Sequence, residues 1–381
     1  MKKILVCIPD FKQGGIPRCL QSLLMNIDVA EYSVDLMCLY QKGPYKGEMP
    51  NCRVLKEDYV VSRLMVHTKK IKNCLFFIPT LGLKVLRSIV LKFFKKDILF
   101  MRLHRLGKNA GEYDAAIAYA EGLPTKVIEN VKARKKLVWI HNDYAFDGAS
   151  GGGKLTDFRK FDVICCVSHA TELSFQNAYP QFRDKTTTLY NVVNEDFIKQ
   201  QANEAIDDIR FNNDIFTIVS VGRVCAQKAF GVIPGIASSL KRQGVKFNWY
   251  IVGGGPADEF ATVVAKINNE EVGDVVIMLG EKDNPYPFIK NSDLYVLTSV
   301  YESYPTVLNE ARVLNVPIVS NSIPPAYEML SDGGAVIVPI DEMAGRIEEL
   351  VKDKALYDSL KSHVFVNRNN EVMNGFYDLM N

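Results

Sequence analysis

Short apolar runs rich in β-branched residues alternate with helical stretches along the whole chain, and this alternation constrains the fold more than any other feature. Such alternation is typical of βαβ units, in which helices cover both faces of a parallel sheet. The runs of the first half that we expect to be strands are Ile4–Ile8, Val34–Leu39, Ala115–Tyr119, Leu137–Ile140 and Val163–Val167. A second series covers Phe216–Val221, Phe247–Val252, Val275–Leu279, Leu294–Thr298, Pro317–Ser320 and Ala335–Val338. The sequence therefore predicts an α/β protein with two Rossmann-like domains.

The length of 381 residues also favours two domains, because one domain usually has ~100–150 residues. We place the first domain at 1–190 and the second at 214–364. The polar stretch 191–213 has few strand-forming residues and is predicted to be a linker. Residues near the chain end, Phe365–Leu379, are expected to be helical.

Composition excludes several classes of protein. The net charge is +2, so no global electrostatic field favours nucleic acid as a partner. The eight cysteines are scattered without the spacing of a disulfide framework or a zinc site. The first apolar stretch, Ile4–Ile8, is too short for a signal peptide, and no uncharged apolar run approaches ~18 residues. We therefore expect a chain that stays in the reducing cytosol.

One segment, 69–108, differs from the rest in charge. It holds eleven lysines and arginines against a single acid, Asp97, and bulky apolar residues lie between the charges. Basic residues interleaved with apolar ones are typical of an element that lies on an anionic membrane surface. Two other interpretations stay open: a pair of core-packing helices with a solvated basic face, and an RNA-binding patch.

The most informative stretch is 299–311, Ser-Val-Tyr-Glu-Ser-Tyr-Pro-Thr-Val-Leu-Asn-Glu-Ala. A predicted strand leads into a helix that opens near Pro305, where proline is tolerated. The amides of Thr306 and Val307 would then face an anion, assisted by the helix dipole. Two carboxylates, Glu302 and Glu310, bracket this position. Ligands bind at the carboxyl ends of strands in open α/β sheets, so this pair is a candidate site.

Two further clusters also follow predicted strands. Arg223 and Lys228 lie in a loop after the first strand of the second series, where they could clamp a diphosphate. The run 251–256, Ile-Val-Gly-Gly-Gly-Pro, ends the next strand, and a tight turn alone would explain its glycines. This run lacks the glycine spacing of the dinucleotide fingerprint, and so does the first strand-to-helix turn over 10–17, which disfavours a dehydrogenase.

Taken in this order and spacing, the motifs resemble those of the retaining glycosyltransferases of family 4. The matching residues are Gly14-Gly15, Val167-Ser168, Tyr190-Asn191 with Asn194, Gly222-Arg223 with Lys228, Gly253–Pro256, Leu279-Gly280, and Glu302 with Glu310-Ala311. The resemblance implies the GT-B fold, α/β with two Rossmann-like domains facing each other across a cleft. It also implies that the second domain binds the donor, that the first binds the acceptor, and that the helix at 365–381 packs back on the first domain.

The same resemblance implies a role for each matching residue. Arg223 and Lys228 would hold the nucleotide diphosphate and stabilise the departing charge. Glu302 would lie against the donor sugar, and Glu310 would bind the ribose hydroxyls. His141 stands where the family often has a histidine near the transferred sugar, so the expected catalytic residues are Glu302, His141, Arg223 and Lys228. The expected donor-binding residues are Gly15, Gly222, Arg223, Lys228, Gly254, Gly280, Glu281, Lys282, Tyr304, Pro305, Thr306, Val307 and Glu310.

The sequence departs from the family at two of these positions. Ala229 stands where a glycine usually follows the lysine, and Pro305 lacks the N–H that could have contacted a phosphate. Neither removes a charge. Fixed cations and amides at the leaving group are the main catalytic device for breaking a sugar–phosphate bond. No Asp-x-Asp motif for a metal is present, so we expect neither a metal nor a cofactor.

The leading hypothesis is a retaining, metal-independent hexosyltransferase of polysaccharide biosynthesis that uses a nucleotide-diphosphate sugar, with UDP favoured. Its acceptor would be a lipid-linked or surface glycan, and the chain would be cytoplasmic and peripheral at the inner face of the cell membrane through 69–108. Two alternatives stay open. One is a GT-B-fold sugar-nucleotide epimerase, and the other is a non-catalytic partner subunit.

Overall fold

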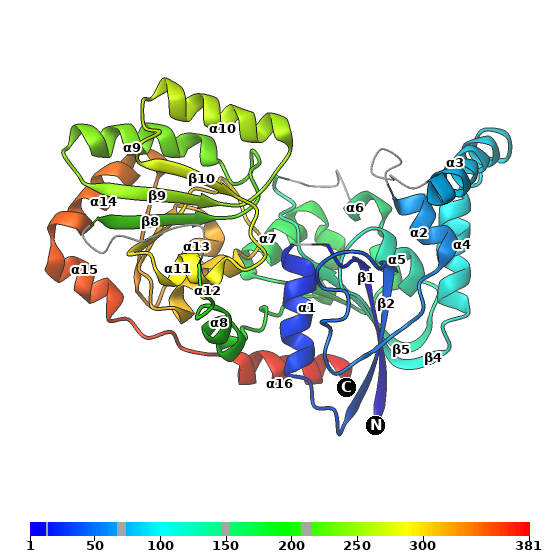
Figure 1. Cartoon of the computed structure of the whole chain (residues 1–381). Coiled ribbons are helices and arrows are strands. Elements are labelled where there is room, and N and C mark those ends of the chain that lie inside the picture. The colour runs from blue at the N-terminus through cyan, green and yellow to red at the C-terminus, as the bar shows by residue number, and fades with distance from the viewer. Residues whose placement is uncertain (13, 67–73, 147–151, 207–214) are drawn as a thin grey trace. The chain divides into compact units, whose positions relative to one another are not determined.

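The computed structural model describes every residue except 13, 67–73, 147–151 and 207–214. The chain forms two compact units (Figure 1). Unit 1 comprises Met1–Val192 together with Arg368–Asn381, and unit 2 comprises Val193–Asn367. Each unit is a parallel sheet with helices on both faces.

The sheet of unit 1 has seven strands in the order β3-β2-β1-β4-β5-β6-β7, all parallel. Its strands are β1 (Lys2–Asp10), β2 (Tyr32–Tyr40), β3 (Arg53–Val54), β4 (Glu112–Ala118), β5 (Lys132–Ile140), β6 (Val163–Cys166) and β7 (Thr186–Thr188). In the central strand β1, Ile4 pairs with Val34 on one side and Ala115 on the other. Residues 4–8 are all buried, which explains why this run is continuously apolar rather than alternating.

Helices cover this sheet and connect its strands. They are α1 (Gly15–Met25), α2 (Tyr59–Met65), α3 (Cys74–Phe94), α4 (Ile98–Lys108), α5 (Leu123–Ile128), α6 (Gly152–Leu155), α7 (His169–Ala178) and α16 (Asn369–Met380). The last of these, α16, comes from the far end of the chain. Its Phe376 is buried beside Trp139, and its Tyr377 stacks on Tyr32 with ring centroids 5.0 Å apart. The C-terminal helix is thus part of the core of unit 1.

The sheet of unit 2 has six parallel strands in the order β10-β9-β8-β11-β12-β13. Its strands are β8 (Phe216–Val221), β9 (Phe247–Val252), β10 (Val276–Gly280), β11 (Leu294–Leu297), β12 (Ile318–Asn321) and β13 (Ala335–Val338). Its helices are α8 (Glu195–Gln201), α9 (Ile233–Arg242), α10 (Ala257–Asn269), α11 (Tyr286–Lys290), α12 (Thr306–Val313), α13 (Pro324–Met329), α14 (Met343–Lys352) and α15 (Lys354–Lys361).

The structure confirms each predicted strand to within a few residues and adds two that the sequence did not predict. The added strands, β3 and β7, have two and three residues, too few to show a pattern. The predicted linker 191–213 is wrong in part, because it contains α8. Asn194 caps this helix by accepting from the amide of Phe197, and Ile198 is buried in the core of unit 2. Residues 207–214 of that stretch lie outside the described residues.

The basic segment forms two helices, α3 and α4, and Lys69, Lys70 and Lys72 fall outside the described residues. Helix α4 packs into the core through Leu99 and Leu103. Helix α3 is held to α4 by an ion pair of 2.6 Å between Arg87 and Asp97. The described helices include none that is both long enough and apolar enough to cross a bilayer.

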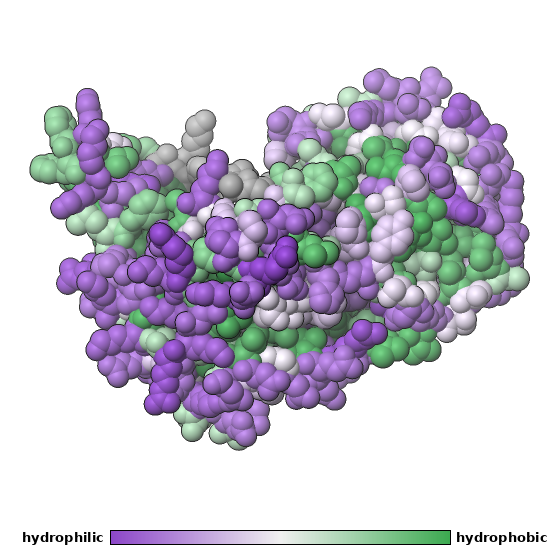
Figure 2. All heavy atoms as spheres, turned by 180° about the vertical axis from the view of Figure 1, so that it is seen from behind, coloured by the Kyte–Doolittle hydropathy of each residue, from purple (hydrophilic) through white to green (hydrophobic). Residues whose placement is uncertain are grey.

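The opposite face of α3 is exposed and apolar. Its outward side chains include Ile78, 70% exposed, and Phe93, 71% exposed. The others on or near this face are Leu81, Val85, Leu86 and Ile89. Figure 2 shows hydrophobic atoms exposed next to hydrophilic ones at its upper left, where the half-turn brings α3. An isolated exposed leucine is ordinary, but a helical stripe of this kind indicates a contact surface.

One backbone position in unit 2 is strained. Ala229 follows Lys228 in the loop after β8 and has φ 52° and ψ 32°, the left-handed conformation in which a Cβ crowds the following carbonyl. Amides from the same turn close this loop, since the Ala229 N–H donates to the carbonyls of Cys225 and Ala226 at 3.2 Å. Tertiary structure therefore imposes on alanine a conformation that suits glycine.

We expect Ala229→Gly to stabilise the protein by about 0.5–1 kcal/mol, because relief of the strained φ outweighs the extra chain entropy of glycine. Urea unfolding followed by circular dichroism measures the change. Ala226→Gly is the matched control, because Ala226 lies in the same loop without a positive φ and its replacement should be neutral or destabilising. An Ala229→Gly midpoint at or below that of the control would contradict the strain.

Candidate functional site

The candidate site lies at the carboxyl edge of the unit 2 sheet, where the strand order reverses. Strand β8 comes first in the sequence of this sheet, yet it lies between β9 and β11 in space. The loops after β8 and β11 therefore leave the same edge and diverge to opposite faces. Such a switch point is where open α/β sheets bind ligands. These two loops carry Arg223, Lys228 and Glu302.

Glycines bring the neighbouring loops close together. A Cβ on Gly253 would lie 1.7 Å from the carbonyl oxygen of Gly222, and one on Gly255 would lie 2.1 Å from that of Val224. The amide of Val224 donates to the carbonyl of Gly254 at 2.8 Å. A Cβ on Gly254 would meet the side chain of Glu281 at 3.0 Å. The triple glycine is thus explained by the close approach of two backbones, more than by the tight turn that the sequence suggested.

The centre of the site is an ion pair between Lys228 and Glu302. The Lys228 Nζ atom lies 2.5 Å from Glu302 Oε1, and the two side chains are only 17% and 9% exposed. The Gln227 amide donates to the other carboxylate oxygen at 3.4 Å and to the carbonyl of Tyr301 at 3.1 Å. Thr298 donates to the Lys228 carbonyl at 2.7 Å. These bonds hold the two loops in one arrangement.

Gly222 makes room for the lysine. A Cβ at this position would come within 3.2 Å of Lys228 Cε, so the side chain of Lys228 runs across the place where another residue would have its own. Arg223, the next residue, is exposed and has no hydrogen bond or ion pair within the described parts of the chain. The site therefore combines one cation that is already paired with one that remains available to an anion.

Helix α12 starts beside this ion pair. Pro305 precedes it and provides no side-chain cap, so the amides of Thr306 and Val307 are not capped from that position. Thr306 is half-buried and Val307 is buried. The positive end of the helix dipole thus adds to the charges of Arg223 and Lys228.

The second carboxylate, Glu310, is buried on α12, four residues after Thr306. Burial raises the pKa of Tyr295 on β11, and the charges of Glu310 and Glu302 raise it further. Both carboxylates are thus close enough to the Tyr295 hydroxyl to influence its ionisation. The Tyr304 hydroxyl accepts a hydrogen bond of 3.0 Å from the Asn309 amide, which ties the loop to the helix.

The predicted base-pocket residues follow β10 at the same edge. Gly280 has φ 71°, so it turns the chain in a conformation that disfavours other residues. Glu281 is exposed, and the ammonium of Lys282 lies 5.9 Å from the centroid of the Phe288 ring. The structure thus brings the predicted residues of unit 2 to neighbouring loops of one edge.

Two predicted residues, Gly15 and His141, belong to unit 1. Gly15 opens α1 after β1, and a Cβ there would meet nothing within 4 Å, so packing does not require a glycine. His141 directly follows β5. Burial lowers the pKa of its imidazole to about 4, while a hydrogen bond to the Tyr119 backbone opposes this. The Nε2 atom is buried and has no hydrogen-bond partner within the described structure.

The sequence analysis missed Glu121, which lies in the loop between β4 and α5. This carboxylate is buried and accepts from the His141 amide and from the Asn142 side chain, each at 3.3 Å. Burial raises the pKa of Glu121 to about 7, against these hydrogen bonds. A signal was present, because a lone carboxylate directly follows a predicted strand at its carboxyl end.

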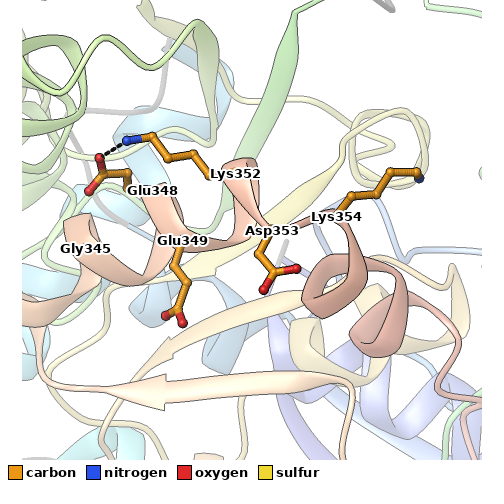
Figure 3. A pocket seen from close by; sticks show the side chains of 6 residues that line it. All are labelled: Gly345, Glu348, Glu349, Lys352, Asp353 and Lys354. Carbon is orange, nitrogen blue, oxygen red and sulfur yellow. Dashed lines mark hydrogen bonds and ion pairs between the residues drawn. The ribbon is translucent and has the colours of Figure 1, made fainter.

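A cavity of about 490 Å³ lies elsewhere in unit 2, along the last turns of α14 and the start of α15 (Figure 3). Its lining residues are Gly345, Glu348, Glu349, Lys352, Asp353 and Lys354. Lys352 pairs with Glu348 at 2.5 Å, as the dashed line shows. None of these residues is in the predicted site, and the cavity is a charged surface depression between two helices.

Comparisons with known proteins agree with this location of the site. Residues 201–364 match the family model described as "Glycosyl transferases group 1". A Campylobacter jejuni enzyme, N-acetylgalactosamine-N,N'-diacetylbacillosaminyl-diphospho-undecaprenol 4-alpha-N-acetylgalactosaminyltransferase, is 22% identical over 95% of this chain and 90% of its own. An uncharacterized glycosyltransferase of Methanocaldococcus jannaschii is 26% identical, over 43% of this chain and 40% of its own. The chain thus spans less than half of that second relative.

Among solved structures, S. aureus TarM, in complex with UDP, fondaparinux and alpha-GlcNAc-glycerol, aligns over the whole of both chains with a TM-score of 0.73 and 14% identity. This likeness shows the fold, which is GT-B. The family match in turn covers most of unit 2, including all the site residues predicted there. Together these findings support a glycosyltransferase of group 1 with the GT-B fold.

Proposed function

We propose that the protein transfers a hexosyl-type sugar, with retention and without a metal, from a nucleotide-diphosphate sugar to a lipid-linked or surface-glycan acceptor. The observation that carries this proposal is the nearly buried Lys228–Glu302 ion pair at the switch point, with exposed Arg223 beside it. Its position before α12 supplies both fixed cations and helix amides to one anion. We favour UDP as the nucleotide, and the TarM complex with UDP supports this choice.

The chemistry follows from where charge develops. As the sugar–phosphate bond breaks, negative charge grows on the diphosphate and positive charge on the sugar ring. In this proposal Lys228 and Arg223 neutralise the diphosphate, and the amides of Thr306 and Val307 donate to its oxygens. Glu302 lies on the same lysine, so it can face the positively charged ring while the cation faces the leaving group. Glu310 binds the ribose hydroxyls one turn into the helix.

Binding of the nucleotide is expected to appear as thermal stabilisation. A ligand at about 100 times its Kd stabilises by roughly 2.7 kcal/mol. We expect UDP to raise the melting temperature in a screen that also contains GDP, ADP, CMP and NAD. Stabilisation by NAD alone, or by none of the five at millimolar concentration, would contradict the proposed donor site.

Lys228→Ala should lower turnover of the nucleotide sugar by roughly 10²–10³-fold, because a preorganised charge at the leaving group is lost. The assay measures release of UDP from the UDP-sugar that stabilises the protein. Lys246→Ala, at an exposed lysine elsewhere in unit 2, is the control and should keep the wild-type rate. A Lys228→Ala protein that is folded and has wild-type turnover would remove Lys228 from the site. Conversion of the donor without any acceptor would instead indicate an epimerase.

We further propose that the protein is cytoplasmic and binds the inner membrane face through α3. The exposed apolar stripe of α3 is flanked by exposed Lys92, Lys95 and Lys96. Each basic residue near an anionic surface adds about 1 kcal/mol, and each buried large apolar side chain about 1.5–3 kcal/mol. The name of the Campylobacter jejuni relative includes an undecaprenol-linked substrate, which agrees with an acceptor held in a membrane.

The double substitution Ile89→Glu with Phe93→Glu should reduce binding to vesicles at least tenfold, because it places two charges in the apolar stripe. Co-sedimentation with vesicles of phosphatidylglycerol and phosphatidylcholine measures binding. The matched control is Val29→Glu with Leu173→Glu, which changes two exposed apolar residues of unit 1 outside α3. Equal binding of the two variants, or no binding of the wild type, would contradict the proposed membrane surface.

A further inference from the structure

Glu121 holds the loop that carries His141. It lies just beyond β4, and His141 lies just beyond β5, so the parallel pairing of these two strands brings them to one edge of the unit 1 sheet. Glu121 Oε2 accepts from the backbone N–H of His141, and Oε1 accepts from the side-chain amide of Asn142. The amide of the next residue, Gly122, donates to Thr156 at 3.2 Å, which fixes the other side of the loop.

The imidazole of His141 is held in one orientation. A hydrogen bond to the Tyr119 backbone engages the ring, whose centroid is 5.2 Å from that of the Tyr119 ring. Because Nε2 has no partner among the described residues, the engaged nitrogen is Nδ1, which must carry the proton to donate to a carbonyl. Nε2 is then an acceptor. A buried acceptor without a partner is unfavourable, which is typical of a site that a ligand completes.

We propose that Glu121 is a positioning residue, which fixes the His141–Asn142 loop so that Nε2 of His141 stays an unprotonated acceptor for a hydroxyl of the transferred sugar. The proposal rests on the proposed function only for the identity of that ligand. A purely structural role is less favourable for Glu121, since an apolar or amide side chain would avoid the cost of a buried carboxylate. Functional sites commonly retain groups that are unfavourable for stability.

The ionisable groups around Glu121 are consistent with this role. They are His141 and Tyr144 on the loop after β5, and Cys166 on β6, whose pKa values are all affected mainly by burial. The pKa of Tyr144 and that of Cys166 are raised, so neither group ionises near neutral pH. The pKa of His141 is lowered to about 4, so its ring stays neutral in the same range. Glu121, with its pKa near 7, is the group here that titrates under working conditions.

The two shifts act on stability in opposite directions. Folding raises the pKa of Glu121, so its contribution is present at low pH and is lost as pH rises from about 4.5 through about 7. Folding lowers the pKa of His141, so its charging destabilises the protein as pH falls from about 6.5 towards about 4. We therefore expect Glu121→Gln to be at least as stable as wild type at pH 8, where the buried charge is removed.

The test follows the histidine itself by long-range proton–nitrogen NMR of protein labelled at its five histidines. The signals that disappear in His141→Gln are those of His141. In the wild type we expect a single tautomer, protonated at Nδ1, and no titration between pH 8 and pH 5. In Glu121→Gln we expect mixed tautomers and a midpoint closer to 6.5. Glu112→Gln, at an exposed glutamate that starts β4, is the control and should leave His141 unchanged.

A reciprocal exchange supplies the rescue. In Glu121→Gln combined with Asn142→Asp, the introduced amide at position 121 donates to the introduced carboxylate at position 142, and its oxygen accepts from the His141 N–H. The single Nδ1-protonated tautomer should return. Wild-type spectra for Glu121→Gln alone, or failure of the exchange to restore them, would overturn the proposal.

Asn142→Asp alone keeps the proposal testable if Glu121→Gln does not fold, because Asn142 is exposed. Two carboxylates then face each other at pH 8, and protonation of Glu121 relieves their repulsion at pH 6. The His141 spectrum should differ from wild type at pH 8 and approach it at pH 6, and the same spectrum at both pH values would count against positioning.

These measurements need no sugar, so they are separate from the proposed function. If His141 responds as expected while UDP does not bind, positioning holds and the transferase proposal fails. If UDP-glucose or UDP-N-acetylglucosamine is turned over, Glu121→Gln should lower kcat at least tenfold with little change in the KM for the donor. An unchanged kcat would show that the fixed imidazole does not assist the reaction.

Discussion

The position of β8 between β9 and β11 is the constraint on which the candidate site depends. Because the strands are parallel, all their carboxyl ends lie at one edge, and because the order reverses at β8, the loops of that edge separate there. The separation leaves space for a ligand, and the glycines at 253 and 255 then draw the β9 loop against the β8 loop. The site residues are 74 positions apart in sequence at their centre, yet they meet because of this pairing.

The Lys228–Glu302 pair has more than one consequence for the site. Removing two charges from water is costly, and their attraction offsets that cost only with good geometry and additional hydrogen bonds. Gln227 and Thr298 supply such bonds, to the carboxylate and to the backbone of the lysine. An arriving diphosphate would compete with Glu302 for the ammonium of Lys228. The same contact thus preorganises the lysine and leaves its affinity adjustable by the ligand.

Several features near the predicted sites are unfavourable for stability. Ala229 is in the left-handed conformation beside Lys228, Nε2 of His141 is buried without a partner in the described structure, and Glu121 is a buried carboxyl with a raised pKa. Elsewhere the described strands and helices follow ordinary patterns of burial and capping. Departures of this kind persist where the surrounding fold enforces them, and they concentrate at functional positions.

The sequence alone determined the two strand series, because burial on both faces of a parallel sheet requires continuous apolar runs, which can be seen locally. It also placed Arg223, Lys228, Glu302 and the start of α12 on loops after strands. Very short strands such as β3 carried too little pattern to be predicted, and α8 was missed because its polar composition concealed a capped helix whose Ile198 is buried.

Only the tertiary structure decided which of these loops touch. The ion pair of Lys228 with Glu302, the close approach at Gly253, and the hydrogen bonds of Glu121 to the His141 loop all join residues from different strands. Strand order sets such contacts, and strand order follows from how whole units pack rather than from any local run of residues. For the same reason the sequence showed where chemistry was available, and the fold showed which groups act together.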